Sequence, residues 1–238
     1  MKIFLIFFLF INLAFAKCNI NAYKLVSSYD LITKCKDNKI YLKNGKVFIY
    51  DDGKKKSFYE LLNNPDIEDM FKFKYPSYWV DSPPKNYDPG RIRFEPLFKE
   101  LYGKSKAEVR SSLVRVKWID GKYILVTKKN GVAKALQEVV KELRLLPSYY
   151  KKYLSPIGGT FNWRKIAGTN RLSVHSFGAA IDINVKYAHY WRWSKGGYKN
   201  LIPKEIVKVF EKHGFIWGGK WYHYDTMHFE YRPELLIK

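Results

Sequence analysis

Two short segments of the 238-residue chain contain side chains that can bind a metal ion. Residues 173–182 read Ser-Val-His-Ser-Phe-Gly-Ala-Ala-Ile-Asp, and residues 221–230 read Trp-Tyr-His-Tyr-Asp-Thr-Met-His-Phe-Glu. Together they supply three candidate ligands for one Zn²⁺ per chain: His175, Asp182 and His228. Three protein ligands leave the fourth tetrahedral position to water, which is the arrangement of a catalytic zinc rather than a structural one. Asp225 lies close by in the sequence and is a candidate base for that water.

A short strand predicted over residues 180–185 would present Asp182. Successive side chains of a strand point to opposite faces, so Asp182 and Asn184 share one face. The other face carries three β-branched residues: Ile181, Ile183 and Val185. If this apolar face packs into the core, Asp182 points into a cleft and Asn184 can orient a ligand by a hydrogen bond. Gly178 and the two alanines after it lack bulk, so we expect a tight turn and a close approach to the metal.

The same alternation applies at the C-terminal segment, where Phe229 and Tyr231 lie opposite His228 and Glu230. Glu230 is thus a second residue that can orient a ligand by a hydrogen bond. Two strands, each with one core face and one ligand-bearing face, would form a rigid floor for the metal.

Two further segments are candidates for bordering the cleft. His223 lies two residues before Asp225 and is predicted to bind substrate. His189 precedes the run Tyr190-Trp191-Arg192-Trp193, which either forms a substrate wall or packs internally.

The remaining patterns predict an α+β fold. Hairpins are expected over residues 39–51 and 114–127, around Asn44-Gly45 and Asp120-Gly121. Helices are expected over residues 57–71, 132–145 and from Pro203 to Gly214. The expected architecture is a small antiparallel sheet that carries the zinc site, flanked by helices and preceded by an N-terminal β-hairpin elaboration. The Pro-rich stretch 76–90 is either a boundary between two parts or a loop that wraps over the cleft.

The N-terminus reads as an export signal. Residues 1–16 combine a short positive start, an apolar run and the small-x-small pattern Ala14-Phe15-Ala16. We expect cleavage after Ala16 and an exported, periplasmic or cell-wall-associated chain, with an uncleaved membrane anchor as the rival reading. No later stretch approaches the ~20 apolar residues of a membrane span. The predicted parts are a signal peptide (1–16), an N-terminal elaboration (17–90) and a catalytic domain (91–238).

The two cysteines, Cys18 and Cys35, lie outside the candidate metal site. In an exported chain they form either a disulfide, which would tie down the mature N-terminus, or two free thiols.

The chain is strongly basic, with 43 Lys+Arg against 22 Asp+Glu and a formal charge of +21. Such a charge favours anionic partners. Export points to an anionic cell-wall surface and not to nucleic acid. The lysines are scattered, which is typical of a solvated surface, and we expect a monomer.

The pattern Ser173-x-His175-x6-Asp182, followed by Asp225-x-x-His228-Phe-Glu, resembles the zinc D-alanyl-D-alanine carboxypeptidase family. This family includes VanY-type carboxypeptidases, D-alanyl-D-alanine dipeptidases and L-alanyl-D-glutamate endopeptidases. The resemblance is strongest over residues 132–233, including Gly-Thr-Phe-Asn-Trp-Arg at 159–164.

The resemblance implies a role for each matching residue. His175, Asp182 and His228 match the family's zinc ligands, and Asp225 takes the place of its catalytic Glu or Asp. Ser173 matches a serine that contacts the substrate carboxylate. Arg164 corresponds to the arginine that polarises the scissile carbonyl, with Arg171 as the competing candidate.

The function implied is hydrolysis of peptidoglycan stem peptides by an exported zinc peptidase. Whether the enzyme removes a terminal D-Ala or cuts an L-Ala–D-Glu bond stays open. The alternatives are a non-catalytic cell-wall-binding protein that keeps the fold, and a disulfide-linked structural protein.

Overall fold

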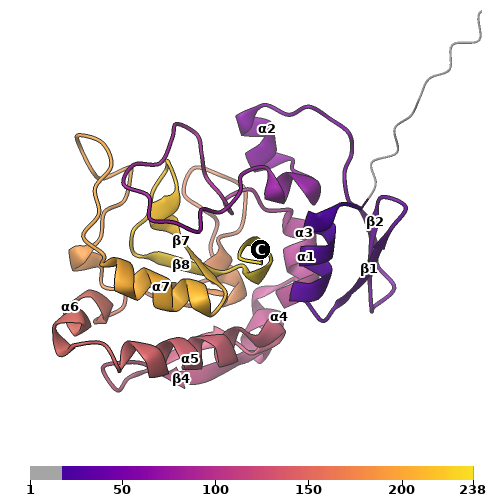
Figure 1. The fold of residues 1–238 in the computed structure, drawn as a ribbon. Helices are drawn as coiled ribbons and strands as arrows, with labels where there is room; N and C mark the ends of the chain where they lie inside the picture. The colour runs from indigo at the N-terminus through magenta and orange to yellow at the C-terminus, as the bar shows by residue number, and fades with distance from the viewer. Residues whose placement is uncertain (1–17, 238) are drawn as a thin grey trace, which may run out of the picture.

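Three small antiparallel sheets and the helices around them make up the described part of the chain, in agreement with the predicted α+β fold (Figure 1). The structure is a computed structural model that describes residues 18–237. The predicted signal peptide, residues 1–16, lies outside the described residues. Among the described helices, none has the length and apolar character needed to cross a membrane.

The N-terminal part contains two helices, α1 (Ile20–Ser28) and α2 (Phe58–Asn63), and one sheet. The sheet has the order β1–β2–β3, with β1 at Ile32–Lys36, β2 at Lys39–Leu42 and β3 at Val47–Ile49. Strands β2 and β3 form the predicted hairpin, whose turn includes Gly45 at a φ of 82°. A disulfide joins Cys18 to Cys35 and ties α1 to the sheet.

Helix α2 is shorter than the helix predicted over residues 57–71. It begins with a capping box, in which the Ser57 hydroxyl accepts from the Glu60 N–H and the Glu60 carboxylate accepts from the Ser57 N–H. The helix ends before Pro65, because the residue preceding a proline avoids the helical conformation. A separate 3₁₀ turn, Glu68–Phe71, follows.

The central part supplies the packing layer under the site. Helices α3 (Glu95–Tyr102) and α4 (Lys106–Ser111) lead into the second predicted hairpin, formed by β4 (Leu113–Lys117) and β5 (Tyr123–Thr127). Helices α5 (Val132–Leu143) and α6 (Lys151–Leu154) follow. The predicted apolar face of α5 is buried: Val132, Leu136, Val139, Val140 and Leu143. Helix α5 packs against β4, β5 and α7.

The third sheet carries the predicted metal site. Its order is β6–β8–β7, with β6 at Ala180–Asp182, β7 at Phe215–Trp217 and β8 at His228–Tyr231. Helix α7 (Lys204–Lys212) begins after Pro203, as predicted, and leads into β7. In the antiparallel register Asp182 lies opposite His228, and Ile181 lies opposite Phe229. Because Ile181 and Phe229 are buried in the core, the alternation of the two strands is as predicted.

The Pro-rich loop of residues 76–90 lies along residues 220–223. The Tyr222 N–H donates to the Tyr87 carbonyl at 2.9 Å, and the Trp221 indole N–H donates to the Pro89 carbonyl at 2.6 Å. The buried Lys220 ammonium donates to the Pro76 carbonyl at 2.8 Å. These bonds favour the wrapping interpretation of the loop. The main core contains residues from both sides of residue 90, and the domain boundary there stays a prediction.

Replacing Phe229 with alanine is expected to destabilise the sheet that carries the site. The Phe229 ring is fully buried and stacks on Phe210 at a centroid distance of 3.9 Å. Loss of a buried phenylalanine side chain costs about 3–5 kcal/mol, which urea denaturation followed by circular dichroism would detect. Tyr123→Ala, at an exposed strand position, is the control and should change the free energy of unfolding by less than about 0.5 kcal/mol. Equal effects of the two substitutions would contradict the packing role of Phe229.

Candidate metal centre

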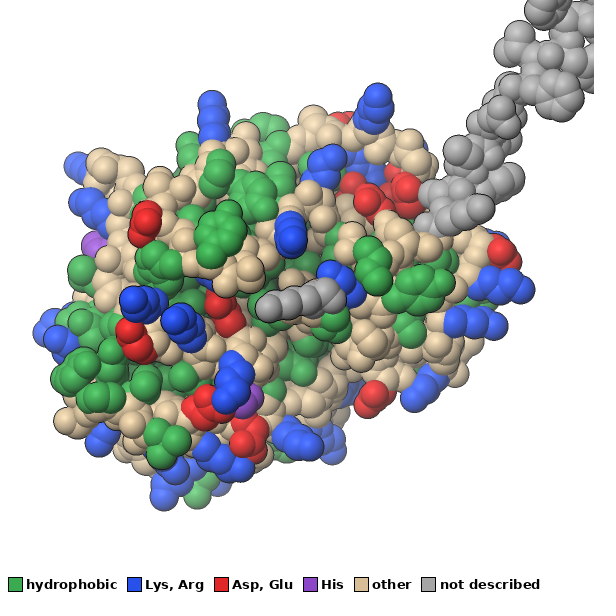
Figure 2. All heavy atoms as spheres, viewed as in Figure 1, with side chains coloured by type: hydrophobic (Ala, Val, Ile, Leu, Met, Phe, Trp, Pro, Cys, Tyr) green, Lys and Arg blue, Asp and Glu red, His purple; other side chains and the backbone are tan. Residues whose placement is uncertain are grey.

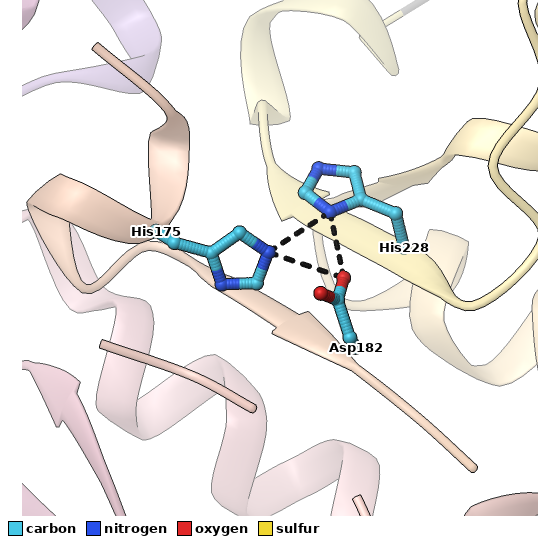
Figure 3. A group of neighbouring side chains, drawn as sticks. All are labelled: His175, Asp182 and His228. Atoms are coloured by element: carbon cyan, nitrogen blue, oxygen red, sulfur yellow. Dashed lines mark hydrogen bonds and ion pairs between the residues drawn. The ribbon is translucent and has the colours of Figure 1, made fainter. Parts of the chain in front are cut away.

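Three side chains from three local structures converge on one point (Figure 3). His175 lies in the 3₁₀ turn Val174–Phe177, Asp182 ends β6, and His228 begins β8. Asp182 Oδ1 lies 3.1 Å from His175 Nε2 and 2.9 Å from His228 Nδ1. The two imidazole nitrogens lie 3.2 Å from each other. The structure thus brings together the three residues that the sequence pattern selects.

The outer nitrogen of each imidazole has its own partner. His175 Nδ1 lies 2.6 Å from the Thr160 carbonyl oxygen, and His228 Nε2 lies 3.1 Å from Glu230 Oε2. Both partners are acceptors, so each outer nitrogen carries the proton and donates. When neutral, each ring therefore turns a lone pair inward, toward the Asp182 carboxylate. Two imidazole nitrogens and one carboxylate this close are a ligand set that fits a divalent metal ion once the inner nitrogens carry no proton.

Glu230 orients His228, as the strand pattern indicated. Besides the imidazole of His228, its carboxylate accepts from Arg93 at 3.4 Å and from Arg232 at 3.2 Å. Burial alone would raise the pKa of Glu230, but Arg93, the hydrogen bond from His228 and Arg232 outweigh it and lower the pKa to about 2. Glu230 is therefore an anion throughout the neutral range. The corresponding expectation for Asn184 is wrong, because its amide donates to the carbonyls of Lys152 and Ser155 and not to a ligand.

Asp225 lies in the turn that leads into β8, beside the three converging residues. Its backbone N–H donates to the Gly218 carbonyl at 3.0 Å. Burial, followed by the charge of Asp182, raises the pKa of Asp225 to about 6. Its Oδ1 is buried and has no hydrogen-bond partner among the described residues. A buried carboxylate oxygen without a partner is costly and points to a group that this site is built to receive.

Gly218 allows the backbone to close around the site, whereas Gly178 allows a close approach elsewhere. At Gly218 a Cβ would meet the Asp225 carbonyl oxygen at 2.6 Å, so a side chain there would displace Asp225. Gly178 has a φ of 65°, and a Cβ there would meet the backbone nitrogen of Thr127 at 3.0 Å. The close approach expected at Gly178 is therefore made to strand β5 and not to the metal site.

A cavity of about 360 Å³ opens over these residues. Ser173, His223 and Arg164 line it, as the sequence predicted. Arg171 does not: it lines a separate small cavity, and its guanidinium donates to the Arg91 carbonyl at 3.3 Å. Of the two competing arginines, only Arg164 thus faces the site.

Part of the aromatic run that follows His189 lies at this cavity. Tyr190, Trp191 and Trp193 of the run line the cavity, together with Trp221, and these four residues form its aromatic wall. His189 faces another cavity, with Trp79 and Tyr198.

Two cationic residues of the cavity were not selected from the sequence. Arg91 and Arg93 follow directly after the Pro-rich loop and face the cavity from outside the two motif segments. Their close spacing is the one sequence signal that marks them, next to a loop for which wrapping over the cleft was one of two alternatives.

Residues 167–231 match the model of a protein family described as D-alanyl-D-alanine carboxypeptidase. The matched segment contains all three converging residues and Asp225, but not Arg164, Arg91 or Arg93. Comparison with curated proteins and with solved structures finds no match. The family match confirms the resemblance over this segment and supports a peptidase activity.

Glu230→Gln is expected to weaken the binding of a divalent metal by about 10–100-fold, because partners that orient a metal-binding histidine contribute on that scale. Glutamine keeps the shape of the side chain but removes the charge that holds the His228 proton. Titration of the metal-free protein with Co²⁺, followed by visible absorption, measures the affinity, and thermal melting verifies folding. Glu142→Gln, in an exposed ion pair with Lys212, is the matched control. Equal affinity of the Glu230→Gln variant and the unmodified chain would contradict the role of Glu230.

Metal binding is expected to weaken as the pH falls. Burial lowers the pKa of His228, but its hydrogen bonds to Asp182 and Glu230 outweigh burial and raise the pKa to about 10. In the metal-free protein His228 therefore keeps a proton that a metal ion must displace. Below this pKa, release of one proton per ion lowers the affinity by about tenfold for each unit of pH lost. Calorimetric titrations in buffers of different ionisation enthalpy count the protons released; binding without proton release would contradict this account.

Proposed function

We propose that the chain is an exported zinc peptidase that hydrolyses peptide bonds in peptidoglycan stem peptides. One observation carries the proposal. The three candidate metal ligands, His175, Asp182 and His228, line the same cavity as Asp225, whose buried Oδ1 has no hydrogen-bond partner among the described residues. The match of residues 167–231 to a family described as D-alanyl-D-alanine carboxypeptidase supports this substrate class. Within that class the proposal covers two reactions, removal of a terminal D-Ala and cleavage of an L-Ala–D-Glu bond.

His175, Asp182 and His228 would hold one Zn²⁺. When bound, zinc supplies a Lewis acid that lowers the pKa of water toward ~7 and polarises a carbonyl. Asp225 accepts the proton of the attacking water and then delivers it to the leaving amine. Its pKa of about 6 suits both steps, because a base effective near neutral pH has a pKa close to the working pH.

The cavity side chains would hold the substrate. Arg164 offers a guanidinium to the negative charge that develops on the scissile carbonyl oxygen, which is the kind of electrostatic stabilisation that speeds acyl transfer. Ser173 contacts a substrate carboxylate, and His223 contacts the peptide. The aromatic wall gives the peptide an apolar surface and limits the access of bulk water.

Export and the cell-wall partner are part of the proposal. The disulfide between Cys18 and Cys35 supports it, because disulfides persist in oxidising compartments outside the cytosol. On the face drawn in Figure 2, lysine and arginine side chains are scattered among acidic ones instead of gathered in one patch. On this face the distribution suits a general attraction of a monomer to an anionic cell-wall surface.

Asp225→Asn is expected to lower the rate of cleavage by about 10²–10⁴-fold, the usual contribution of a general acid–base residue. The zinc-loaded protein and the variant are incubated with purified peptidoglycan fragments, and the products are identified by mass. The masses also decide which of the two bonds is cut.

A chelator should abolish cleavage and added Zn²⁺ should restore it. Asp120→Asn, in the exposed hairpin turn between β4 and β5, is the control and should cleave like the unmodified chain. Binding of the fragments without any chelator-sensitive cleavage would favour a cell-wall-binding protein that only keeps the fold.

A further inference from the structure

The N-terminal part reaches the cavity through Asp88, at the end of the Pro-rich loop. Asp88 is fully buried, and both of its carboxylate oxygens are engaged. Oδ1 accepts from the backbone N–H of His223 at 2.9 Å. Oδ2 lies 2.6 Å from His223 Nδ1 and accepts from the Arg91 guanidinium at 2.8 Å. Two of these three contacts thus hold a single residue, His223.

The His223 ring is fixed on its other sides as well. Phe58, from helix α2, stacks on the ring at a centroid distance of 5.8 Å and an angle of 18°. Trp191, from the aromatic wall, meets it at 4.6 Å in a T-shaped contact. The ring therefore has one orientation, with Nδ1 directed to Asp88. Nε2, on the opposite edge, has no hydrogen-bond partner among the described residues, and His223 lines the cavity.

The charge of Asp88 sets which nitrogen of His223 carries the proton. Burial would raise the pKa of Asp88, but the hydrogen bonds from His223 and the charge of Arg91 outweigh it and lower the pKa. The carboxylate is therefore an anion that accepts, so Nδ1 donates. A histidine held in this way presents Nε2 in a defined position and state, much as carboxylate–histidine pairs do in metal sites.

We propose that Asp88 is a positioning residue that fixes His223 so that His223 Nε2 hydrogen-bonds the peptide substrate. The N-terminal part of the chain then belongs to the substrate site, although it lies outside the segment that matches the peptidase family. This inference rests on the proposed peptidase function.

The role of Asp88 can be tested because other bonds are expected to hold the Pro-rich loop against residues 221–222 when the charge of Asp88 is removed. The bonds of Tyr222 and Trp221 to the carbonyls of Tyr87 and Pro89 do not involve the Asp88 side chain. In Asp88→Asn, an amide oxygen still accepts from the His223 N–H, while the amide nitrogen faces Nδ1 and cannot accept from it. The amide can only donate to Nδ1, so the neutral imidazole takes the other tautomer and Nε2 changes from an acceptor to a donor.

A double-mutant cycle tests whether Asp88 acts through His223. His223→Asn keeps an amide at the position of Nδ1, which can donate to Asp88, but removes Nε2. Each single variant is expected to raise KM for the peptide by about tenfold while kcat changes by less than about threefold, because a lost uniform-binding contact acts on KM. The double variant should be no worse than His223→Asn, because residues that act through one contact are not additive. A merely structural role of Asp88 would multiply the two effects, and this result would overturn the inference.

Asp81→Asn, in an exposed part of the same loop, is the control and should keep the KM of the unmodified chain. Metal affinity should be unchanged in the folded variants, and thermal melting verifies that they are folded. If Asp88→Asn does not fold, the same cycle is run with Asp88→Glu, which shifts the carboxylate by one methylene group. An unmodified chain that cleaves nothing would overturn the peptidase proposal itself, whereas an active chain with additive effects overturns only the role of Asp88.

Discussion

The buried carboxylate of Glu230 is the interaction on which the rest of the site depends. It is 1% exposed and accepts from a candidate metal ligand, His228, and from two arginines, Arg93 and Arg232. An unpaired buried charge is strongly unfavourable, so none of these groups can be removed without leaving another uncompensated. The orientation of His228 is therefore coupled to the chain after the Pro-rich loop and to the C-terminal residues.

The same network continues to the N-terminal helix. Arg232 is fully buried, pairs with Glu234 and donates to the Gly90 carbonyl at 2.6 Å. Glu234 in turn accepts from the Tyr29 hydroxyl at 2.7 Å, at the end of α1. A continuous line of buried polar contacts thus joins the first described helix to a candidate metal ligand. Removing the N-terminal part would leave Arg232 and Glu234 with unpaired groups, and it would also expose part of the hydrophobic core that the two predicted parts share.

Local sequence patterns predicted the strands that carry the candidate metal ligands Asp182 and His228. Period-two alternation located β6 and β8, Asn44-Gly45 and Asp120-Gly121 located two turns, and Ser57 with Glu60 located a helix start, because each signal lies within a few residues. The partners of the site were not predictable in this way. Asp88 and Arg93 meet His223 and Glu230 across 135 and 137 residues, and no spacing rule reaches that far.

The wrong expectation for Asn184 and the open choice between two arginines both depend on the path of the chain, which local patterns do not predict. In a strand that continued to residue 185, Asn184 would lie on the same face as Asp182. Strand β6 ends at Asp182, however, and the Asn184 amide caps the following turn and donates to the Lys152 carbonyl. The choice between Arg164 and Arg171 also depends on the path of the chain between them. The segment doubles back, with Lys165 bridged to Leu172, and only Arg164 is left at the cavity.

The division of the site along the chain has a consequence for specificity. The proposed ligands and base all lie in the segment that matches the peptidase family, residues 167–231. Most cationic groups of the cavity lie before it: Arg91, Arg93 and Arg164. The proposed peptide substrate would carry its negative charge on carboxylates, and arginine is the side chain best suited to bind them. Under the proposed function, the matching segment thus supplies the proposed ligands and base, while the choice of bond would depend on residues that the match does not cover.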